Sequence, residues 1–125
     1  MDALDVVHHL RYVEVDGDAC ERAADSSGIS CEIVDIRSLR PLDEETILAS
    51  VEKTGRVAIV HEAPHTAGFG AELAAVIAER SLLHLQAPVL RVTGYDVPYP
   101  YWQLEDLYVP SVERVSSAIR QLLDF

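Results

Sequence analysis

The sequence has little positive charge and no long hydrophobic run. Lysine occurs once, at Lys53, and the 10 basic residues are outnumbered by 21 acidic ones, for a formal net charge of -11 at pH 7. Proteins that bind nucleic acid set clustered lysines and arginines against phosphates, so this balance argues against that class. No stretch approaches the roughly 18 apolar residues of a membrane-spanning helix. We therefore expect no nucleic acid and no membrane among the partners, and the acidic surface suits a basic protein.

Cysteine is also scarce, and the usual signatures of catalysis are missing. Of the two cysteines, Cys20 and Cys31, the second falls in an apolar run and is expected to pack as a small core residue. The first residues, MDALD, lack the basic start of a secretory signal. We expect a cytoplasmic location, where a disulfide is disfavoured. The sequence contains no nucleophile elbow, phosphate-binding loop or C-x-x-C pair, so it declares no active site.

Strand-like and helix-like segments alternate along the chain, which at 125 residues and 49% hydrophobic content suits one domain with one core. Short β-branched runs predict strands at residues 30–36, 56–60 and 89–92. Apolar residues at helical spacing predict helices from Asp43 to the stop at Gly55, over residues 71–81, and after the cap Ser111. This alternation predicts an α/β domain with a mainly parallel sheet.

The first 27 residues are harder to interpret. Strand-like residues occur at 3–7 and at 10–15, and residues 12–15 could form an edge strand. Residues 18–27 are typical of a short helix with Asp18 as its cap and Gly28 as its stop.

Residues 61–70, HEAPHTAGFG, follow the predicted strand 56–60, and such loops are where α/β proteins usually place ligand or partner contacts. His61 to His65 match H-E-x-x-H, the zinc motif of metalloproteases. That motif needs a helix to bring both histidines to one face, whereas here it follows a strand and contains Pro64. No third ligand is marked, so we expect no metal site.

The glycines of this loop begin like a dinucleotide-binding G-x-G-x-x-G motif, but Leu73 replaces the third glycine. Gly68 and Gly70 either shape the turn only, receive an anion at the helix start, or let another backbone approach closely at an interface.

Three acidic residues, Asp35, Glu62 and Asp96, lie near predicted strand ends. Paired carboxylates can perform acid–base chemistry. Surface acids more often pair with nearby cations, so the favoured interpretation is pairing with arginines such as Arg37, Arg40 or Arg91.

Residues 94–110 form a long predicted loop that carries five aromatic side chains: Tyr95, Tyr99, Tyr101, Trp102 and Tyr108. The loop either packs on itself as a cover over the sheet edge or offers a surface to a partner. Tyrosine and tryptophan are the commonest anchors of protein interfaces, which favours the partner surface.

Three stretches together resemble a known family: CEIVDIRSLRPLDEETILASVEKTGR, then VAIVHEAPHTAGFGAEL, then APVLRVTGYDVPYP. In order and spacing, residues 28–123 resemble the C-terminal domain of the beta subunit of the decarboxylating component of 2-oxo acid dehydrogenase complexes. That domain has the transketolase C-terminal fold. The variants HEAP-x-T-x-GFGAE and GYD-x-P-x-P look more like the branched-chain (2-oxoisovalerate) members than the pyruvate members.

The resemblance implies a three-layer α/β/α domain with a mostly parallel sheet. It assigns residues 28–125 to that domain and leaves residues 1–27 as a poorly matched N-terminal segment. It also implies a heterotetramer of two alpha and two beta subunits that uses thiamine diphosphate and magnesium. The thiamine sites of that family lie between the alpha subunit and the N-terminal domain of the beta subunit, outside the matched stretch.

No catalytic, cofactor-binding or metal-binding residue is therefore transferred, and the chain alone is expected to be inactive. The implied partners are the alpha subunit, a second beta subunit and the binding domain of the acyltransferase core. The alternative is a stand-alone, non-catalytic protein-binding module of the same fold. The candidate interface residues are His61, Glu62, Pro64, Phe69, Gly70, Tyr95, Asp96, Tyr99, Trp102 and Phe125.

Overall fold

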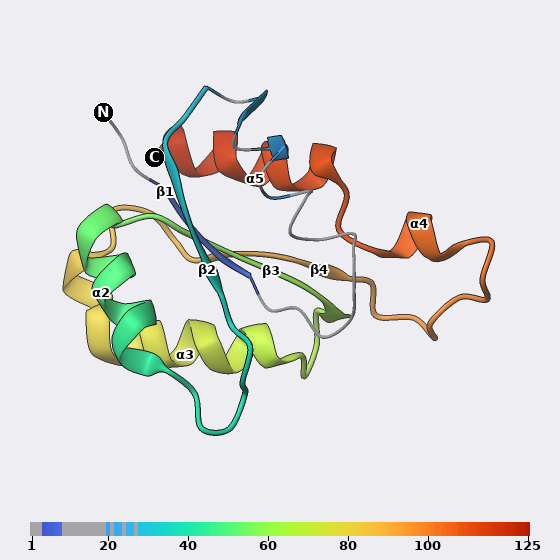
Figure 1. Ribbon diagram of the computed structural model, residues 1–125, viewed down its shortest axis with the longest axis horizontal. Coiled ribbons are helices and arrows are strands. Elements are labelled where there is room, and N and C mark those ends of the chain that lie inside the picture. Colours follow the sequence, from blue (N-terminus) through green and yellow to red (C-terminus); the bar gives the residue numbers. More distant parts are fainter. Residues whose placement is uncertain (1–3, 9–19, 21, 24, 27) are drawn as a thin grey trace.

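A single parallel sheet forms the centre of the computed structural model, which describes residues 4–8, 20, 22–23, 25–26 and 28–125 (Figure 1). Its strands are β1 (Leu4–His8), β2 (Cys31–Asp35), β3 (Val57–Pro64) and β4 (Leu90–Gly94), in the order β2-β1-β3-β4. Each neighbouring pair is parallel. The first strand of the chain, β1, lies inside the sheet between β2 and β3. The predicted parallel sheet is confirmed.

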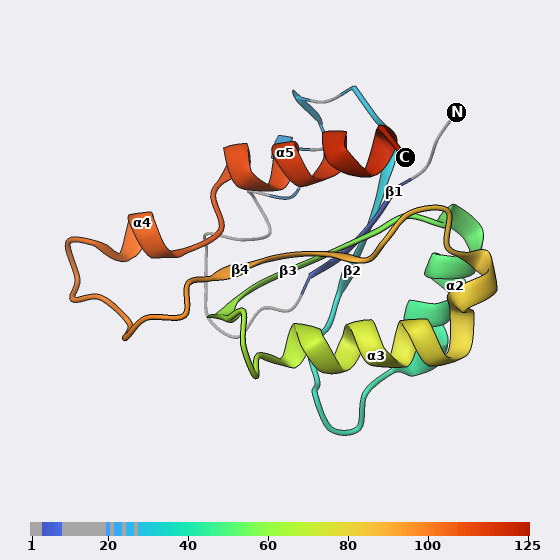
Figure 2. The same cartoon turned by 180° about the vertical axis from the view of Figure 1, so that it is seen from behind.

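Helices cover both faces of the sheet (Figures 1 and 2). Helices α2 (Glu44–Thr54) and α3 (Phe69–Ser81) lie on one face, and α5 (Val112–Leu123) lies on the other. The central strand β3 serves both layers because successive side chains of a strand point to opposite faces. Val57 and Ile59 pack in the core with α2 and α3, whereas Ala58 and Val60 pack in the core with α5. The three-layer α/β/α prediction is confirmed.

The capping residues predicted from the sequence mark most helix ends correctly. The Asp43 carboxylate accepts a hydrogen bond from the backbone N–H of Thr46 at the start of α2, and Gly55 ends that helix with a positive φ of 71°. The Ser111 hydroxyl accepts one from the N–H of Arg114 at the start of α5. Residues 20, 22–23 and 25–26 are helical, and Gly28 follows them with a φ of 68°. The predicted strand at 12–15 and the cap at Asp18 lie outside the described residues.

The bounds predicted for the strand, loop and helix between residues 56 and 81 are wrong. β3 does not end at Val60 but continues to Pro64, and α3 begins at Phe69, so the ten-residue loop shrinks to residues 65–68. The apolar run ends at Val60, but strand pairing does not, because Pro64 still pairs with Gly94 of β4 after an irregular register. Two short elements were not predicted: the 3-10 helix η1 (Leu82–His84) and α4 (Glu105–Tyr108).

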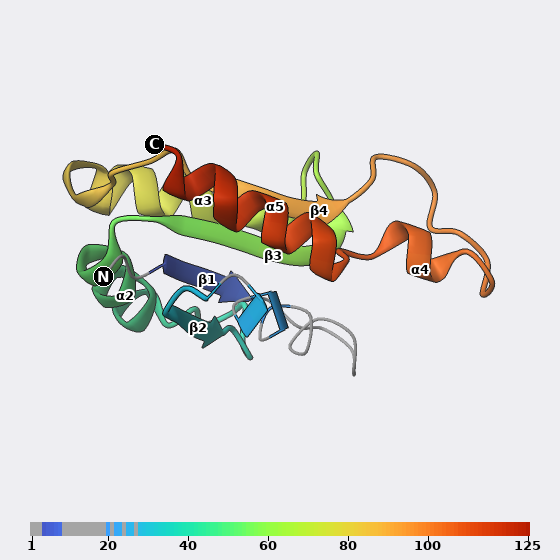
Figure 3. The same cartoon turned by 90° about the horizontal axis from the view of Figure 1, so that it is seen from above.

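The long loop after β4 projects away from the body of the domain, with α4 on its return path (Figures 1 and 3). We call residues 95–107 the aromatic arm. A cover packed on the sheet edge would bury these side chains, yet most of the large ones are exposed. The alternative of a self-packed cover is therefore wrong for the arm beyond its root. In the part of the chain that the structure describes, no helix is long and apolar enough to cross a bilayer.

Candidate protein interface

The glycines at the start of α3 make room for a buried histidine. His61 lies in β3 and only 1% of its surface is exposed. A Cβ built on Gly70 would lie 2.2 Å from Nε2 of His61, and one on Gly68 would lie 2.2 Å from the carbonyl oxygen of Pro64. The space at these glycines is filled by the chain's own atoms rather than left for a pyrophosphate. A backbone atom does approach Gly68 closely, whereas Gly70 faces a side chain, and an interface role for these glycines stays a prediction.

The two histidines of H-E-x-x-H have separate environments. His61 is enclosed beside α3, whereas His65 is exposed in the turn that follows β3. The ring Nε2 of His65 lies 2.8 Å from Nη2 of Arg91, and its Nδ1 lies 3.4 Å from the hydroxyl of Thr93. The motif is extended rather than helical, so the metalloprotease geometry is not formed. Within the described ranges, no group of three histidine, cysteine or acidic side chains could hold a metal ion.

The three acidic residues near the strand ends differ in their contacts. Asp35 forms an exposed ion pair with Nε of Arg37 at 3.1 Å, as predicted. Asp96 does not follow the predicted arginine pairing: its two oxygens accept hydrogen bonds from the N–H of Thr66 at 2.8 Å and from the hydroxyl of Thr66 at 2.6 Å. These two bonds hold the pKa of Asp96 below its usual value, with a smaller effect from His65.

Glu62 lies at the root of the arm, where it helps to raise the pKa of Tyr99 and Tyr108 by repelling the phenolate forms. Burial is the larger cause of both shifts.

A small aromatic cluster builds the root of the arm. The Tyr108 ring is 5% exposed and packs edge-to-face with Tyr99, at 4.9 Å between centroids, and with Tyr95 at 6.3 Å. The Arg114 guanidinium lies 4.7 Å from the Tyr95 centroid and donates through Nη2 to the Thr93 carbonyl at 2.6 Å. These contacts fix where the arm leaves the domain.

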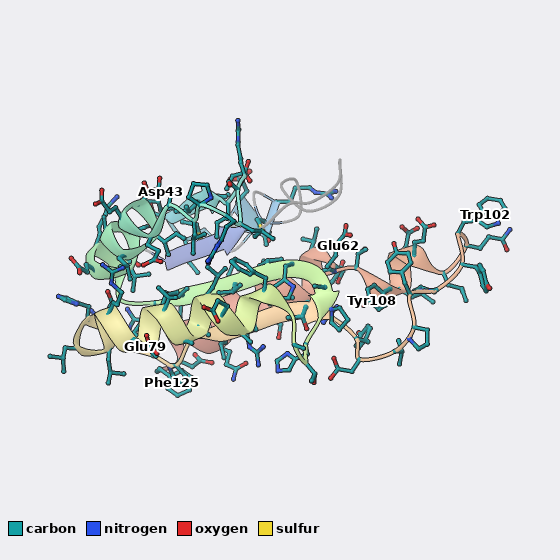
Figure 4. The ribbon with its side chains drawn as sticks, turned by 90° about the horizontal axis from the view of Figure 1, so that it is seen from below. Asp43, Glu62, Glu79, Trp102, Tyr108 and Phe125 are labelled. Carbon is teal, nitrogen blue, oxygen red and sulfur yellow. The ribbon has the colours of Figure 1, made fainter. Side chains whose placement is uncertain are left out.

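Beyond this root the arm carries exposed apolar side chains together with a few acidic ones (Figure 4). Tyr101 is 91% exposed and Trp102 is 76% exposed. Residues 95–108 include no lysine, arginine or histidine, whereas Glu105 and Asp106 stand beside the apolar side chains. The other exposed large hydrophobic residues of the arm are Tyr95, Val97, Tyr99, Leu104 and Leu107. Exposed apolar surface of this kind is typical of an interface.

The structure divides the predicted interface residues into groups. Glu62, Pro64, Phe69, Tyr95, Asp96, Tyr99 and Trp102 belong to the end of β3, the turn, the start of α3 and the arm. His61 and Gly70 lie beneath that surface, buried by neighbouring atoms. Phe125 is exposed at the C-terminus, away from the arm (Figures 1 and 4).

Sequence reasoning missed Thr66, Thr93 and Arg114, which tie the arm to the domain. The bonds between Thr66 and Asp96 span 30 residues of the chain and the bond from Arg114 to the Thr93 carbonyl spans 21, so no local pattern marks them.

A hollow of about 230 Å³ lies between the end of β2 and the start of α2. Its charged lining residues are already engaged: Asp43 accepts two hydrogen bonds from Thr46, and Asp35 pairs with Arg37. The remaining lining is largely apolar, so this hollow has little to recognise a polar ligand.

Comparison with known proteins gives a consistent picture. The 2-oxoisovalerate dehydrogenase subunit beta of Pseudomonas aeruginosa is 52% identical over 104 residues, which is 83% of this chain and 29% of that protein. The mitochondrial 2-oxoisovalerate dehydrogenase subunit beta 2 of Arabidopsis thaliana is 49% identical over 82% of this chain and 28% of its own length. The pyruvate dehydrogenase E1 component subunit beta of Leifsonia xyli is 45% identical, over 86% and 32%. The chain thus spans less than a third of the length of these relatives.

A solved structure, "Split gene transketolase, inactive beta4 tetramer", matches with a TM-score of 0.76 and 26% sequence identity, covering 98% of this chain and 38% of that one. The family model "Transketolase, C-terminal domain" matches residues 12–115. That match begins before residue 28, and the domain boundary placed there stays a prediction. The matched residues include all of β2, β3, β4, the turn and the aromatic arm. The chain belongs to the transketolase C-terminal domain family.

Proposed function

We propose that this chain is the C-terminal assembly domain of the beta subunit of a thiamine diphosphate-dependent 2-oxo acid dehydrogenase, of the branched-chain type. The observation that carries the proposal is the aromatic arm, an exposed apolar segment on a rigid root. Three relatives of roughly half identity are named as beta subunits of such dehydrogenases, which supports the enzyme class. The whole enzyme would oxidatively decarboxylate a branched-chain 2-oxo acid or pyruvate.

In this proposal the arm contacts a neighbouring subunit, either the alpha subunit or the second beta subunit. Its acidic residues Glu105 and Asp106 favour a partner surface that combines an apolar groove with arginine or lysine at the rim. The exposed C-terminal Phe125 lies on a different part of the domain and is assigned to the binding domain of the acyltransferase core. That contact should weaken with salt because the chain carries a net charge of -11.

The described residues do not fit a site for thiamine diphosphate or magnesium. Among the described residues, the glycine-flanked start of α3 is the candidate for receiving a diphosphate, and it is closed by His61 and by the Pro64 carbonyl. The carboxylate of Asp96 is already engaged by Thr66, and no group of three histidine, cysteine or acidic side chains in the described part of the chain could hold a metal ion. We assign no cofactor and no catalytic residue to this chain, and we propose that it has no activity by itself.

The test uses the Pseudomonas aeruginosa relative. This chain replaces the 104 matching residues of its beta subunit, and the chimera is produced with the companion alpha subunit. Tyr101→Ala with Trp102→Ala should weaken subunit association by roughly 30-fold, the effect of losing one interface hot spot. Folding should be largely unchanged, since Tyr101 is 91% and Trp102 76% exposed.

The Phe125→Ala chimera is the matched control. It should assemble normally but bind the acyltransferase binding domain more weakly. Normal assembly of the Tyr101→Ala, Trp102→Ala chimera, judged by light scattering after size-exclusion chromatography, would contradict the arm's role in assembly. That result would favour the stand-alone binding module.

A further inference from the structure

One carboxylate joins the root of the aromatic arm to the turn between β3 and α3. Asp96 is the second residue of the arm, and Thr66 lies in the turn, 30 residues earlier in the chain. Both oxygens of Asp96 are used: one accepts from the backbone N–H of Thr66 and the other from its hydroxyl. Such two-point contact fixes orientation as well as distance, because rotation of the carboxylate would break at least one bond.

The turn that Asp96 holds is not a relaxed one. Ala67 has a φ of 59°, in the left-handed region that side-chain-bearing residues rarely adopt. Arg91 of β4 supports the same turn by donating through Nη1 to the carbonyl of His65 at 3.0 Å. A strained backbone persists only where its surroundings hold it in place, and here the hydrogen bonds come from β4 and from the arm.

On the other side of the arm's root, Arg114 of α5 stacks on Tyr95 and donates to the carbonyl of Thr93. The arm therefore leaves the domain between two fixed points, one on each side. Its tip has no equivalent support, since Tyr101 and Trp102 are exposed. The direction of the arm depends on its root.

We infer that Asp96 is a positioning residue: it locks the aromatic arm to the β3–α3 turn, so that the arm, the turn and Phe69 meet a partner protein as one preformed surface. The inference rests on the proposed role of the arm in assembly and refines it, because Asp96 acts on Thr66 instead of touching the partner. Ordering a loop during association costs affinity, and a surface that is already ordered avoids that loss. The surface is acidic and apolar, so it fits a partner with a basic rim.

The chain supplies its own matched control. At the start of α2, Asp43 makes the same pair of bonds to Thr46, at 3.1 Å from the N–H and 2.7 Å from the hydroxyl. That pair is local, spans three residues and has no connection with the arm. Thr66→Val and Thr46→Val each remove one hydroxyl from an Asp–Thr pair while keeping the shape of the side chain. Only the first should affect the arm.

A direct readout is available because Trp102, on the arm, is the single tryptophan of the chain. Time-resolved fluorescence anisotropy of Trp102 measures nanosecond motion of the arm without any partner. Thr66→Val and Asp96→Ala should enlarge the fast decay, whereas Thr46→Val should leave it unchanged. Thr66→Ser, which keeps the hydroxyl, should restore the decay of the original protein.

Association is then measured in the chimeric dehydrogenase. Thr66→Val should weaken it roughly three- to tenfold, about the effect of one net hydrogen bond, and Thr46→Val should not. Unchanged anisotropy in both Thr66→Val and Asp96→Ala would overturn the positioning role. Increased motion with unchanged association would overturn the preformed docking surface. If the double variant Tyr101→Ala, Trp102→Ala loses association and Thr66→Val does not, the proposed function stands and only this inference is refuted.

Discussion

Gly70→Ala should destabilise the domain even though alanine is the better helix former. Gly70 is the second residue of α3, and a Cβ there would lie 2.2 Å from Nε2 and 2.6 Å from Cδ2 of His61. It would also lie 3.2 Å from Cγ2 of Ile59. The first two distances are far inside van der Waals contact. His61 cannot move out of the way into solvent because it is 1% exposed and fixed in the central strand.

Two opposing effects set the magnitude. Replacing glycine by alanine within a helix stabilises by about 0.5–1 kcal/mol. Forcing an extra methyl group into a packed core costs about 1–3 kcal/mol, and the upper part of that range applies where the contacts are this short. We expect a net loss of about 2 kcal/mol in the free energy of unfolding. When His61→Ala removes the ring, the same Gly70→Ala change should instead stabilise by about 0.5–1 kcal/mol.

The assay is urea unfolding of the four proteins of this double-mutant cycle, followed by circular dichroism. The coupling energy between positions 61 and 70 should be roughly 2–3 kcal/mol. Gly28→Ala is the control, because no atom lies within 4 Å of a Cβ there and only its positive φ opposes the change. It should cost about 1 kcal/mol and show no coupling to His61. A stable Gly70→Ala variant, or zero coupling, would refute the close packing of His61 against α3.

Three further predictions concern the turn, its pH dependence and the cofactor. Ala67→Gly should raise the free energy of unfolding by about 0.5–1 kcal/mol in urea titrations, since glycine adopts the left-handed conformation without strain; a loss of stability would contradict it. Hydrogen bonds from Thr66 lower the pKa of Asp96 in the folded protein. The stability that these bonds contribute should therefore be fully present above pH 3.8, the usual pKa of the carboxyl group, and be lost as pH falls through the lowered pKa. The fast decay of Trp102 anisotropy should then grow only below about pH 4, and the change should be smaller in Thr66→Val, which already lacks one of the two bonds. A transition at higher pH, or one of equal size in Thr66→Val, would refute the assignment. Calorimetry with thiamine diphosphate and Mg²⁺ should detect no micromolar binding to the 125-residue chain, and decarboxylation assays on 2-oxoisovalerate and pyruvate should detect no turnover. Either binding or turnover would contradict the proposal that this chain holds no cofactor and has no activity by itself.

The sequence predicted those parts of the fold that depend on neighbouring residues. Asp43, Gly55 and Ser111 marked helix ends correctly because caps involve backbone groups within three or four positions. The alternation of strands and helices likewise follows from the spacing of apolar residues within each short segment. The end of β3 did not follow, since the pairing of Pro64 with Gly94 depends on a strand that lies 30 residues further along. A polar residue such as His61 looked like the start of a loop, although α3 buries it.

The candidate interface was only half visible in the sequence for the same reason. The number of aromatic residues between 95 and 108 pointed to a partner surface, and their exposure supports it. The pattern could not say that Tyr108 turns inward while Trp102 turns outward. It also could not reveal the Asp96–Thr66 contact, because both residues have ordinary loop preferences. Predicting that pair requires knowing that β3 and β4 are neighbours, which the strand order supplies.

The distribution of exposed apolar surface bears on the choice between the two functions proposed for this chain. The aromatic arm projects beyond the carboxyl end of β4, whereas the C-terminal end of α3 and the C-terminus lie at the other end of the domain (Figures 1 and 2). Large apolar side chains are exposed there too: Leu82 and Leu83 in η1, which follows α3, and Phe125 at the C-terminus. Arg56 ties that second end together by donating to the Leu122 carbonyl and to Gln86. A binding module with one partner needs one such surface. Two surfaces at opposite ends suit a domain held between different neighbours, as a subunit of a larger assembly is, and this favours the dehydrogenase over the stand-alone module.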